Sequence, residues 1–334
     1  MPQQRRKRIY RAFMLAPIIL GAMLLVGCTN AGTAATSSAP IGTISEFSLP
    51  TPNSLPARIT VGPDGNLWFT EKVGNKIGRI TPKGTITEFS LPTPNSFPAG
   101  ITAGPDGNLW FTELTGTIGR ITPKGVITEF HLSTPGELPG GITMGPGGSI
   151  WFSEFTSSIG QITPDGKISQ TSLLATPSLA EGITAGPGGT LWFTDSETGN
   201  IGHMMSGGAV MEFPLPTPTR SPEGITAGPN GTLWFTELTG NRIGRSTSDG
   251  KITEFGLPTS NSNPMGIVAG PGNTLWFTEL AGNKIGRVTA QGTVSELPLP
   301  TANGAPMGIT AGPGNTLWFT ESTGNKIGRV TPGQ

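Results

Sequence analysis

Hydrophobic and polar positions alternate in short runs that recur at a fixed interval along most of this chain. In the segment 100–139, such runs occur at 100–103, 108–113, 118–122 and 126–132, and Gly- and Pro-rich turn sequences separate them. Short runs with period-two alternation are typical of β-strands joined by tight turns. The pattern predicts four antiparallel strands in this segment. No part of the chain after the first thirty residues has an apolar period suited to a long α-helix.

The four-strand unit is repeated seven times. Each copy contains the tetrapeptide Trp-Phe-(Thr/Ser)-(Glu/Asp), and successive tryptophans are 41 or 42 residues apart. These are the only seven tryptophans in the chain: Trp68, Trp110, Trp151, Trp192, Trp234, Trp276 and Trp318. A four-stranded unit at this interval is the signature of a β-propeller blade. The sequence therefore predicts an all-β fold, a single seven-bladed β-propeller of four-stranded antiparallel blades.

The seventh copy ends before its fourth strand. Only three residues follow its third predicted strand at 326–331, whereas Ile-Ser-Glu-Phe-Ser-Leu at 44–49 matches the fourth-strand sequence at 86–91. We expect this N-terminal strand to complete the last blade, because that pairing closes the ring and leaves no open strand edge.

The segment before the repeats has the composition of an export signal. A basic stretch at 5–11 precedes an apolar run at 12–26, which is shorter than the ~20 residues of a membrane-spanning helix. Leu-Val-Gly-Cys then ends at Cys28, the only cysteine, and resembles a bacterial lipobox. A plain signal peptide with an incidental cysteine is the alternative.

These features predict a lipoprotein signal peptide at 1–27, a flexible Thr/Ala/Ser tether at 28–42 and the propeller at 43–334. The expected location is outside the cell's cytoplasm, lipid-anchored to the outer side of the bacterial cytoplasmic membrane. Without residues 1–27 the chain keeps 16 basic and 21 acidic residues, a net charge of −5. Because no Lys/Arg run remains, we expect no nucleic-acid partner. A monomer that contacts the membrane through its N-terminal lipid is expected.

An acidic residue ends the tetrapeptide in every blade. These residues are Glu71, Glu113, Glu154, Asp195, Glu237, Glu279 and Glu321. Five blades also carry an arginine in the third predicted strand: Arg79, Arg120, Arg245, Arg287 and Arg329. We expect carboxylate–guanidinium pairs within blades, a structural role repeated around the ring, in preference to a metal or acid/base cluster. Gln161 and His203 replace this arginine in the third and fourth blades, so Glu154 and Asp195 are expected to lack the usual partner.

The residue before each Gly-Ile strand varies from blade to blade. In order, these residues are Ala57, Ala99, Gly140, Glu181, Glu223, Met265 and Met307, and Arg58 replaces the glycine that follows in the first blade. The first strand of a propeller blade lines the central channel. The ring therefore predicts an asymmetric channel mouth with neighbouring carboxylates and neighbouring thioethers, suited to a specific ligand. Neutral drift at a solvated loop is the alternative.

Three motifs make the chain resemble one family. Leu-Trp-Phe-Thr-Glu at 67–71, Gly-Asn-Lys-Ile-Gly-Arg-Ile-Thr at 74–81 and Ile-Thr-Glu-Phe-Ser-Leu-Pro-Thr-Pro at 86–94 resemble the virginiamycin B lyase, or streptogramin lyase, family, over roughly residues 43–331. The resemblance implies an enzyme that opens a cyclic depsipeptide antibiotic by elimination at its ester bond, and hence antibiotic resistance. It also implies a histidine base and a bound Mg²⁺ at the channel mouth.

Most of the site residues that the resemblance implies are replaced here. The family's substrate-binding and catalytic histidines fall at Met265 and Met307, its metal carboxylates at Ala305 and near Glu321 or Ser322, and a substrate-side tyrosine at Ala57. A thioether cannot act as the proton-accepting base. The only histidines, His131 and His203, fall on predicted outer strands. No catalytic residue is assigned, and Glu321 is the one candidate metal ligand.

Three classes of function remain. The preferred one is a non-catalytic, surface-tethered propeller without a cofactor, which binds a small-molecule, peptide or cell-envelope ligand at the mouth formed by Ala57, Glu181, Glu223, Met265 and Met307. The alternative is a Mg²⁺-dependent carbon–oxygen lyase with a rearranged site that uses Glu181 and Glu223. The third is a purely structural module of the cell envelope.

The substitution Cys28→Ser tests the predicted anchor. It should release or mislocalise the protein, because the acyl chains attached to a lipoprotein cysteine hold it at the membrane. Cell fractionation measures the effect, with Thr29→Ser as a control that keeps the cysteine. A Cys28→Ser protein that stays in the membrane fraction with unchanged processing would show that the lipobox interpretation is wrong.

Overall fold

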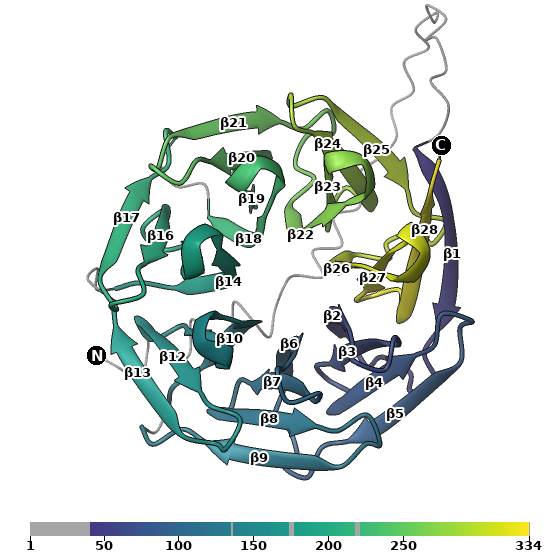
Figure 1. Cartoon of the computed structure of the whole chain (residues 1–334). Coiled ribbons are helices and arrows are strands. Elements are labelled where there is room, and N and C mark those ends of the chain that lie inside the picture. Colours follow the sequence, from purple (N-terminus) through teal and green to yellow (C-terminus); the bar gives the residue numbers. More distant parts are fainter. Residues whose placement is uncertain (1–40, 135, 174–176, 218–220, 334) are drawn as a thin grey trace, which may run out of the picture. The chain divides into compact units, whose positions relative to one another are not determined.

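The computed structural model describes residues 41–333 except 135, 174–176 and 218–220. These residues belong to one compact unit, 40–334. They form seven four-stranded antiparallel sheets arranged in a ring around a central channel (Figure 1). The predicted seven-bladed β-propeller is confirmed. The predicted signal peptide, Cys28 and nearly all of the predicted tether lie outside the described residues.

Each blade runs from the channel to the rim. Blade 1 contains β2 (Pro56–Val61), β3 (Leu67–Glu71), β4 (Lys76–Ile80) and β5 (Ile86–Ser90), and blade 2 contains β6 (Pro98–Ala103), β7 (Leu109–Glu113), β8 (Thr117–Ile121) and β9 (Ile127–His131). Blade 3 contains β10 (Pro139–Met144), β11 (Ile150–Glu154), β12 (Ser158–Ile162) and β13 (Ile168–Ser172), and blade 4 contains β14 (Ala180–Gly186), β15 (Thr190–Asp195), β16 (Asn200–Met204) and β17 (Val210–Pro214).

Blade 5 contains β18 (Pro222–Ala227), β19 (Leu233–Glu237), β20 (Arg242–Ser246) and β21 (Ile252–Gly256), and blade 6 contains β22 (Pro264–Gly270), β23 (Thr274–Glu279), β24 (Lys284–Thr289) and β25 (Val294–Pro298). Blade 7 contains β26 (Pro306–Ala311), β27 (Leu317–Glu321), β28 (Lys326–Pro332) and β1 (Gly42–Ser48). The helical segments in the described residues are single 3₁₀ turns between first and second strands: η1 (Pro146–Gly148), η2 (Pro187–Gly189), η3 (Pro229–Gly231), η4 (Pro271–Asn273) and η5 (Pro313–Asn315). None of these helices is long and apolar enough to span a membrane.

The N-terminal strand closes the ring, as the sequence predicts. β1 pairs antiparallel with β28 from Gly42 opposite Pro332 to Ser48 opposite Lys326, so pairing begins at the last residue of the predicted tether. A side-chain ion pair reinforces the closure, since Lys326 Nζ lies 2.7 Å from Glu46 Oε2. Blade 7 therefore has its fourth strand from the opposite end of the chain.

The core lies between neighbouring blades. Trp68 and Ile77 of blade 1 pack against Ile101, Leu109 and Phe111 of blade 2, and equivalent clusters occur around the ring. In six blades the tryptophan is at most 1% exposed. Because each sheet packs both of its faces against neighbours, all five residues of second strands such as β3 and β7 are buried, the polar Thr and Glu included.

The arginines of the third strands pack against aromatic rings. The register places Arg79 opposite Trp68 and Glu71 opposite Lys76. The guanidinium carbon of Arg79 lies 5.4 Å from the Trp68 ring and 5.6 Å from the Phe89 ring, within the range of a cation–π interaction. The predicted carboxylate–guanidinium pairs are therefore wrong. The acid and the arginine lie at opposite ends of the hairpin, because the turn at 72–75 sets the pairing.

The acids expected to lack a partner in blades 3 and 4 have other hydrogen-bond donors. Gln170 Nε2 donates to Glu154 at 2.8 Å. The backbone N–H groups of Leu179 and Glu197 donate to Asp195 Oδ1, each at 3.1 Å. None of these donors is an arginine, so both acids lack the expected usual partner, and Gln161 and His203 lie opposite Trp151 and Trp192 and not beside the acids.

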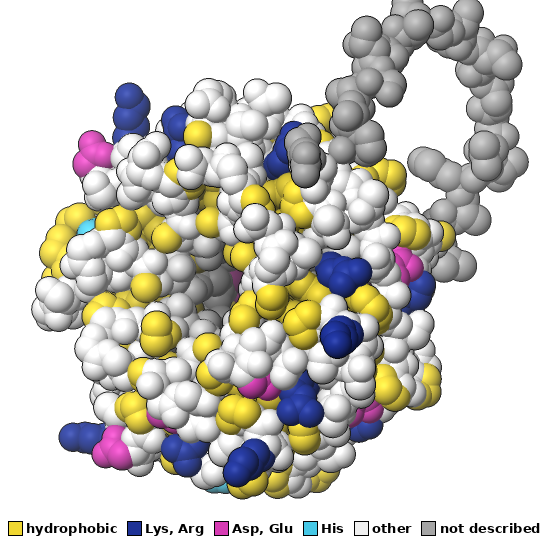
Figure 2. Space-filling model, turned by 45° about the vertical axis from the view of Figure 1, so that its right-hand side comes forward, with side chains coloured by type: hydrophobic (Ala, Val, Ile, Leu, Met, Phe, Trp, Pro, Cys, Tyr) yellow, Lys and Arg dark blue, Asp and Glu magenta, His cyan; other side chains and the backbone are white. Residues whose placement is uncertain are grey.

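The outer surface carries dispersed charge. On the face seen in Figure 2, Lys and Arg side chains are scattered over the molecule, and Asp or Glu side chains lie near several of them. This face shows no concentration of positive charge among the described residues.

Candidate functional site

The first strand of each blade starts at one face of the ring, and we call the opening of the central channel at this face the channel mouth. The turns between second and third strands also lie at this face, because adjacent strands are antiparallel. The turns between first and second strands and between third and fourth strands lie at the opposite face. The seven positions before the Gly-Ile strands therefore surround the mouth, as the sequence predicts.

A hydroxyl group from the second strand fixes the backbone at each of these positions. In blade 2, the Gly100 N–H donates to Thr112 Oγ1 at 2.8 Å, and the Thr112 hydroxyl donates to the Gly140 carbonyl of blade 3 at 2.7 Å. The same bridge to the next blade occurs all round the ring, through Thr70 to Ala99, Ser153 to Glu181, Thr194 to Glu223, Thr236 to Met265, Thr278 to Met307 and Thr320 to Ala57. The Thr or Ser of the repeated tetrapeptide thus positions the mouth.

The first strands approach one another closely. A Cβ added at Gly182 would lie 2.4 Å from the carbonyl oxygen of Glu223 in blade 5, and one at Gly224 would lie 2.4 Å from that of Met265. These distances leave no room for a side chain. Glycine follows the mouth residue in six blades for this reason, and Arg58 in blade 1 is the exception.

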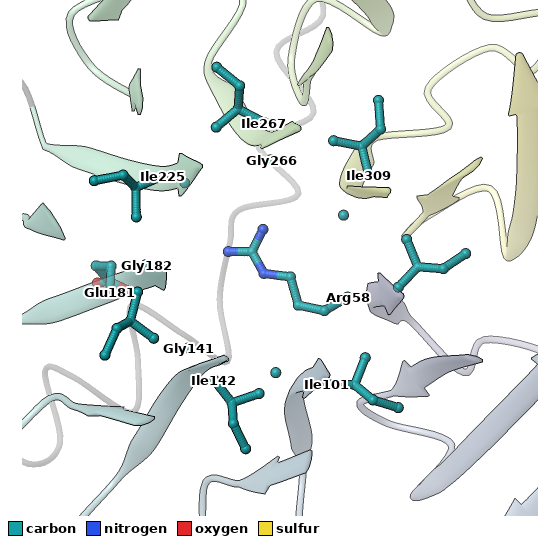
Figure 3. Close-up of a pocket in the computed structure, with 15 residues that line it drawn as sticks. Arg58, Ile101, Gly141, Ile142, Glu181, Gly182, Ile225, Gly266, Ile267 and Ile309 are labelled. Atoms are coloured by element: carbon teal, nitrogen blue, oxygen red, sulfur yellow. The ribbon is translucent and has the colours of Figure 1, made fainter. Parts of the chain in front are cut away.

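Arg58 extends into the channel. Figure 3 shows the Arg58 side chain extending from β2 with its guanidinium near the centre of the ring, on the side that faces β14 and Glu181. The cavity around it has a volume of about 180 Å³ and is lined by the Gly-Ile pairs of the first strands together with Arg58 and Glu181. Arg58 thus places a positive charge inside a channel that Glu181 also lines.

Glu181 and Glu223 form an acidic pair near this guanidinium. Glu181 is 9% exposed, and its Oε1 accepts a hydrogen bond from Ser196 Oγ at 3.2 Å. Burial raises the pKa of Glu181 well above its usual range, and the charge of Glu223 adds to this effect. Burial also raises the pKa of Glu223 to about 7, while Arg58 opposes the shift. The pair of carboxyl groups therefore retains a proton near neutral pH.

Lys72 joins this charged group, and sequence reasoning missed it. Burial lowers the pKa of Lys72, and the charge of Glu181 counteracts that shift. Its position follows the tetrapeptide, where the other blades carry Leu114, Phe155, Ser196, Leu238, Leu280 and Ser322. The sequence could have indicated this role for Lys72, because it is a charged residue at a position that apolar residues or serine occupy in the other blades.

The opposite part of the mouth is apolar. Met265 and Met307 are half-buried near the start of β22 and β26, and Ala57 is 6% exposed near the start of β2. Their carbonyl oxygens accept the bridging hydroxyl groups, so their backbone is fixed. The mouth therefore combines two thioethers on neighbouring blades with the acidic pair of blades 4 and 5.

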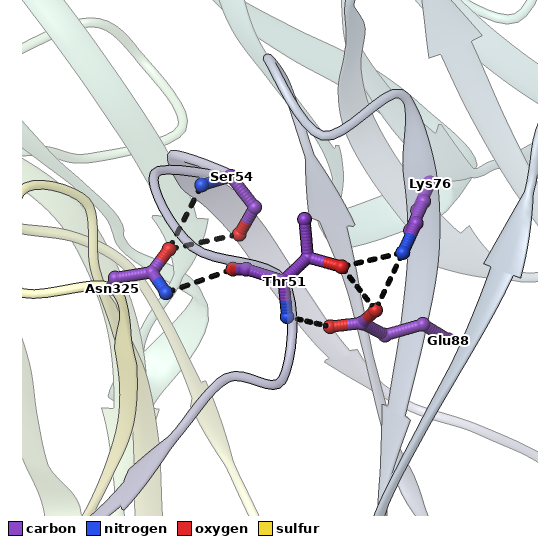
Figure 4. Close-up of polar contacts among 5 residues, drawn as sticks. All are labelled: Thr51, Ser54, Lys76, Glu88 and Asn325. Atoms are coloured by element: carbon purple, nitrogen blue, oxygen red, sulfur yellow. Dashed lines mark hydrogen bonds and ion pairs between the residues drawn. The ribbon is translucent and has the colours of Figure 1, made fainter.

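The segments that lead into the first strands are held by polar contacts at the same face. Between blades 7 and 1, Asn325 accepts hydrogen bonds from the N–H and hydroxyl of Ser54 and donates to the Thr51 carbonyl (Figure 4). Thr51 also donates to Glu88, which pairs with Lys76 at 2.7 Å. These contacts tie the segment to both blades and keep the mouth in place.

Both histidines lie away from the mouth. His131 ends β9, the outermost strand of blade 2, and its Nδ1 lies 3.1 Å from Thr117 Oγ1. His203 lies on β16 and stacks on Trp192 with ring centroids 4.1 Å apart. Burial lowers the pKa of His203. The prediction that they lie on outer strands of different blades is confirmed for His131, whereas His203 lies on the third strand.

The residues of blade 7 do not fit a magnesium site. Glu321 is fully buried, and a Cβ added at Gly304 or Gly324 would lie 2.6 or 2.7 Å from its Oε2. Ala305 offers no side-chain oxygen, and the soft thioether of Met307 is a poor ligand for a hard cation. No group of three or more His, Cys, Asp or Glu side chains suited to a metal occurs in the described part of the chain. The assignment of Glu321 to a metal stays a prediction.

A sequence model of the virginiamycin B lyase family matches residues 31–179 and 158–334. Among solved structures, virginiamycin B lyase from Staphylococcus aureus is 43% identical, with a TM-score of 0.83, over 86% of this chain and 99% of that one. A streptogramin B lyase is 40% identical, with a TM-score of 0.85, over 89% of this chain and 100% of the other. A catalytically inactive histidine-to-alanine variant of the Staphylococcus aureus enzyme with quinupristin is similar to the same extent as the first, with 43% identity and a TM-score of 0.83, over 86% of this chain and 99% of the variant. No curated protein matches the chain significantly.

The buried acids of the tetrapeptide predict a specific dependence of stability on pH. Burial raises the pKa of Glu113 to about 7, the charge of Glu129 adds to the shift and the Ser96 hydroxyl opposes it. Since the ordinary value is 4.5, the folded protein binds this proton more tightly than the unfolded chain. The resulting stabilisation is present below pH 4.5 and is lost as the pH rises through 7.

At pH 8, the free energy of unfolding of Glu113→Gln should therefore be about 1–3 kcal/mol higher than that of the original protein. At pH 5 this difference should be smaller. Denaturant unfolding at the two pH values measures it. Glu197→Gln, at an exposed position, serves as the control and should show no such change with pH. A Glu113→Gln protein less stable than the original at pH 8 would contradict the assignment.

Proposed function

The chain belongs to the virginiamycin B lyase family, and we propose that it is a non-catalytic member that binds a ligand at its channel mouth. One observation supports this above all. The chain has two histidines, and both lie on blade strands away from the mouth, whereas Met265 and Met307 occupy the mouth positions.

The lack of a base at the Met307 position argues against efficient elimination by the mechanism that the family resemblance implies. Elimination next to a carbonyl requires a group that accepts the proton within hydrogen-bond reach and with a pKa near the working pH. Met307 has no such acceptor. In the Staphylococcus aureus relative, replacing one histidine by alanine gives a catalytically inactive protein. The family resemblance places the catalytic histidine at Met307 of this chain.

The mouth has the groups needed to bind a peptide-like ligand. Arg58 and Lys72 can pair with carboxylate or carbonyl oxygens, and the acidic pair can accept hydrogen bonds from amide or amine groups. Met265 and Met307 offer flexible, polarizable surface that adapts to apolar side chains. Because a propeller of this family is known with quinupristin, this antibiotic is the natural first probe.

A lyase with a rearranged site is the second candidate, and one observation favours it. The pKa of Glu223 is raised to about 7, which is the range that suits a general base. Arg58, close enough to affect this pKa, could stabilise negative charge that develops on a substrate oxygen. In this mechanism Glu223 would remove the proton, and Glu181 would keep its own.

We place the protein outside the cytoplasm, attached to the membrane through Cys28. The basic and apolar segments at 5–11 and 12–26 and the position of the only cysteine support this proposal. The Cys28→Ser fractionation experiment tests it independently of any ligand.

Incubation with quinupristin and Mg²⁺, followed by chromatography and tandem mass spectrometry of the antibiotic, tests the function, because elimination opens the ring without a change in mass. We expect no ring opening above the protein-free control, because loss of a positioned base alone lowers the rate by ~10²–10⁴. We expect saturable quinupristin binding by calorimetry, weakened at least tenfold in Arg58→Ala and unchanged in the control Lys124→Gln, at an exposed position on the opposite face.

Each alternative outcome has a clear meaning. Turnover that Glu223→Gln abolishes would overturn the non-catalytic proposal and place the active site on blades 4 and 5. No turnover together with no effect of Arg58→Ala on binding would refute the mouth as the ligand site.

A further inference from the structure

In four blades, an arginine and a phenylalanine side chain fill the space between the blade's tryptophan and the next blade. In blade 1 the Arg79 guanidinium lies beside Trp68 and Phe89, and its Nη1 donates to the Pro123 carbonyl of blade 2 at 3.0 Å. The same arrangement occurs with Trp110, Arg120 and Phe130, with Trp234, Arg245 and Phe255, and with Trp318, Arg329 and Phe47. A planar cation and an aromatic ring thus occupy this space.

Blade 3 lacks both groups. Gln161 stands opposite Trp151, where the arginine would be, and Thr171 stands opposite Ile159, where the phenylalanine would be. A cavity of about 320 Å³ lies there, lined by Trp151, Gln161 and Thr171 of blade 3 and by Leu191, Met205 and Ser206 of blade 4. It lies between blades 3 and 4 at the face opposite the channel mouth.

Trp151 differs from the other tryptophans. It is the only one of the seven that is not fully buried. In five blades the indole N–H donates to a side chain of the preceding turn, as in Trp110 to Asp106. The Trp151 N–H, like that of Trp192, has no hydrogen-bond partner among the described residues, so partial exposure is what sets Trp151 apart. Its ring is thus a partly open wall of the cavity.

The space for an aromatic ring is empty on the blade 4 side as well. A Cβ added at Gly125 would lie 2.3 Å from the Phe89 ring, and the equivalent glycines facing Phe47, Phe130, Phe213 and Phe255 give 2.1–2.4 Å. At Gly208, the equivalent residue of blade 4, nothing lies within 4 Å. The turn that receives a phenylalanine elsewhere receives nothing here.

Blade 4 also has the backbone carbonyl that corresponds to the one accepting a hydrogen bond from arginine in blades 1, 2, 5 and 7. The turn at 205–209 is closed by hydrogen bonds from Met205 N–H to the Ala209 carbonyl and from Gly208 N–H to the Met205 carbonyl, at 2.9 and 2.8 Å. The turn at 122–126 in blade 2 has the same two bonds at the same lengths. The Ser206 carbonyl therefore corresponds to the Pro123 carbonyl.

We propose that this cavity is a second binding site, for a small organic cation that joins a planar amidinium or guanidinium group to an aromatic ring. The cation lies over Trp151 and donates to the Ser206 carbonyl, and the aromatic ring lies against Gly208. Met205 adapts to the ring. The ligand reproduces the contacts that blades 1, 2, 5 and 7 make with their own side chains.

Benzamidine is the first probe, and benzamide is its uncharged counterpart of the same shape. Benzamidine should quench tryptophan fluorescence saturably and raise Tm by about 2–4 °C at roughly ten times its Kd. Benzamide should bind at least tenfold more weakly. The double variant Gln161→Arg with Thr171→Phe fills the cavity with the protein's own side chains, so it should lose the benzamidine effect and melt at a higher temperature.

Two further variants test whether benzamidine binds at this cavity and not at the channel mouth, and whether its loss comes from filling the cavity and not from misfolding. Glu181→Gln with Glu223→Gln removes the acidic pair and should leave the benzamidine effect unchanged. Thr171→Phe alone fills only the ring half of the cavity and should still weaken binding at least fivefold. Equal binding of benzamide, no saturable effect in the original protein, or binding that survives the filled cavity would each refute the proposal.

Discussion

A ring of seven hydroxyl groups determines where every residue at the channel mouth lies. Each hydroxyl accepts a hydrogen bond from the first strand of its own blade and donates one to a mouth carbonyl of the next blade, as Thr194 does between Gly182 and Glu223. Buried backbone groups that lose such a partner cost free energy. The blades therefore meet at a fixed distance, which the close approach of the glycines in the first strands also requires.

These bridges use backbone atoms of the mouth residues and leave their side chains free. Carboxylates, thioethers and small residues consequently occupy equivalent positions without disturbing the ring. The proposed replacement of the family's histidines by Met265 and Met307 is compatible with the unchanged propeller architecture for this reason. The same independence holds at the opposite face, where blade 3 lacks its arginine and phenylalanine but keeps its four strands and their register.

The sequence was sufficient for the strands, the number of blades and the closure by β1, because a pattern copied seven times averages out local ambiguity. It failed where pairing across a hairpin mattered, as Arg79 lies opposite Trp68 and not beside Glu71. The bridging role of the threonines was also missed, since a residue present in nearly every blade does not reveal its partner. The grouping of Arg58, Lys72 and Glu181 brings blades 1 and 4 together, and no local pattern links residues so far apart.

The central proposal is that the hydroxyl ring holds the backbone of the mouth in the family's arrangement, and that side-chain replacements alone have removed the lyase chemistry. The most direct test is quinupristin ring opening with Mg²⁺ by a variant with Ala57→Tyr, Met265→His, Ala305→Glu and Met307→His, measured by chromatography and tandem mass spectrometry. Because the backbone at these positions is fixed, we predict turnover well above that of the original protein. A folded variant that binds quinupristin but shows no turnover would contradict the claim.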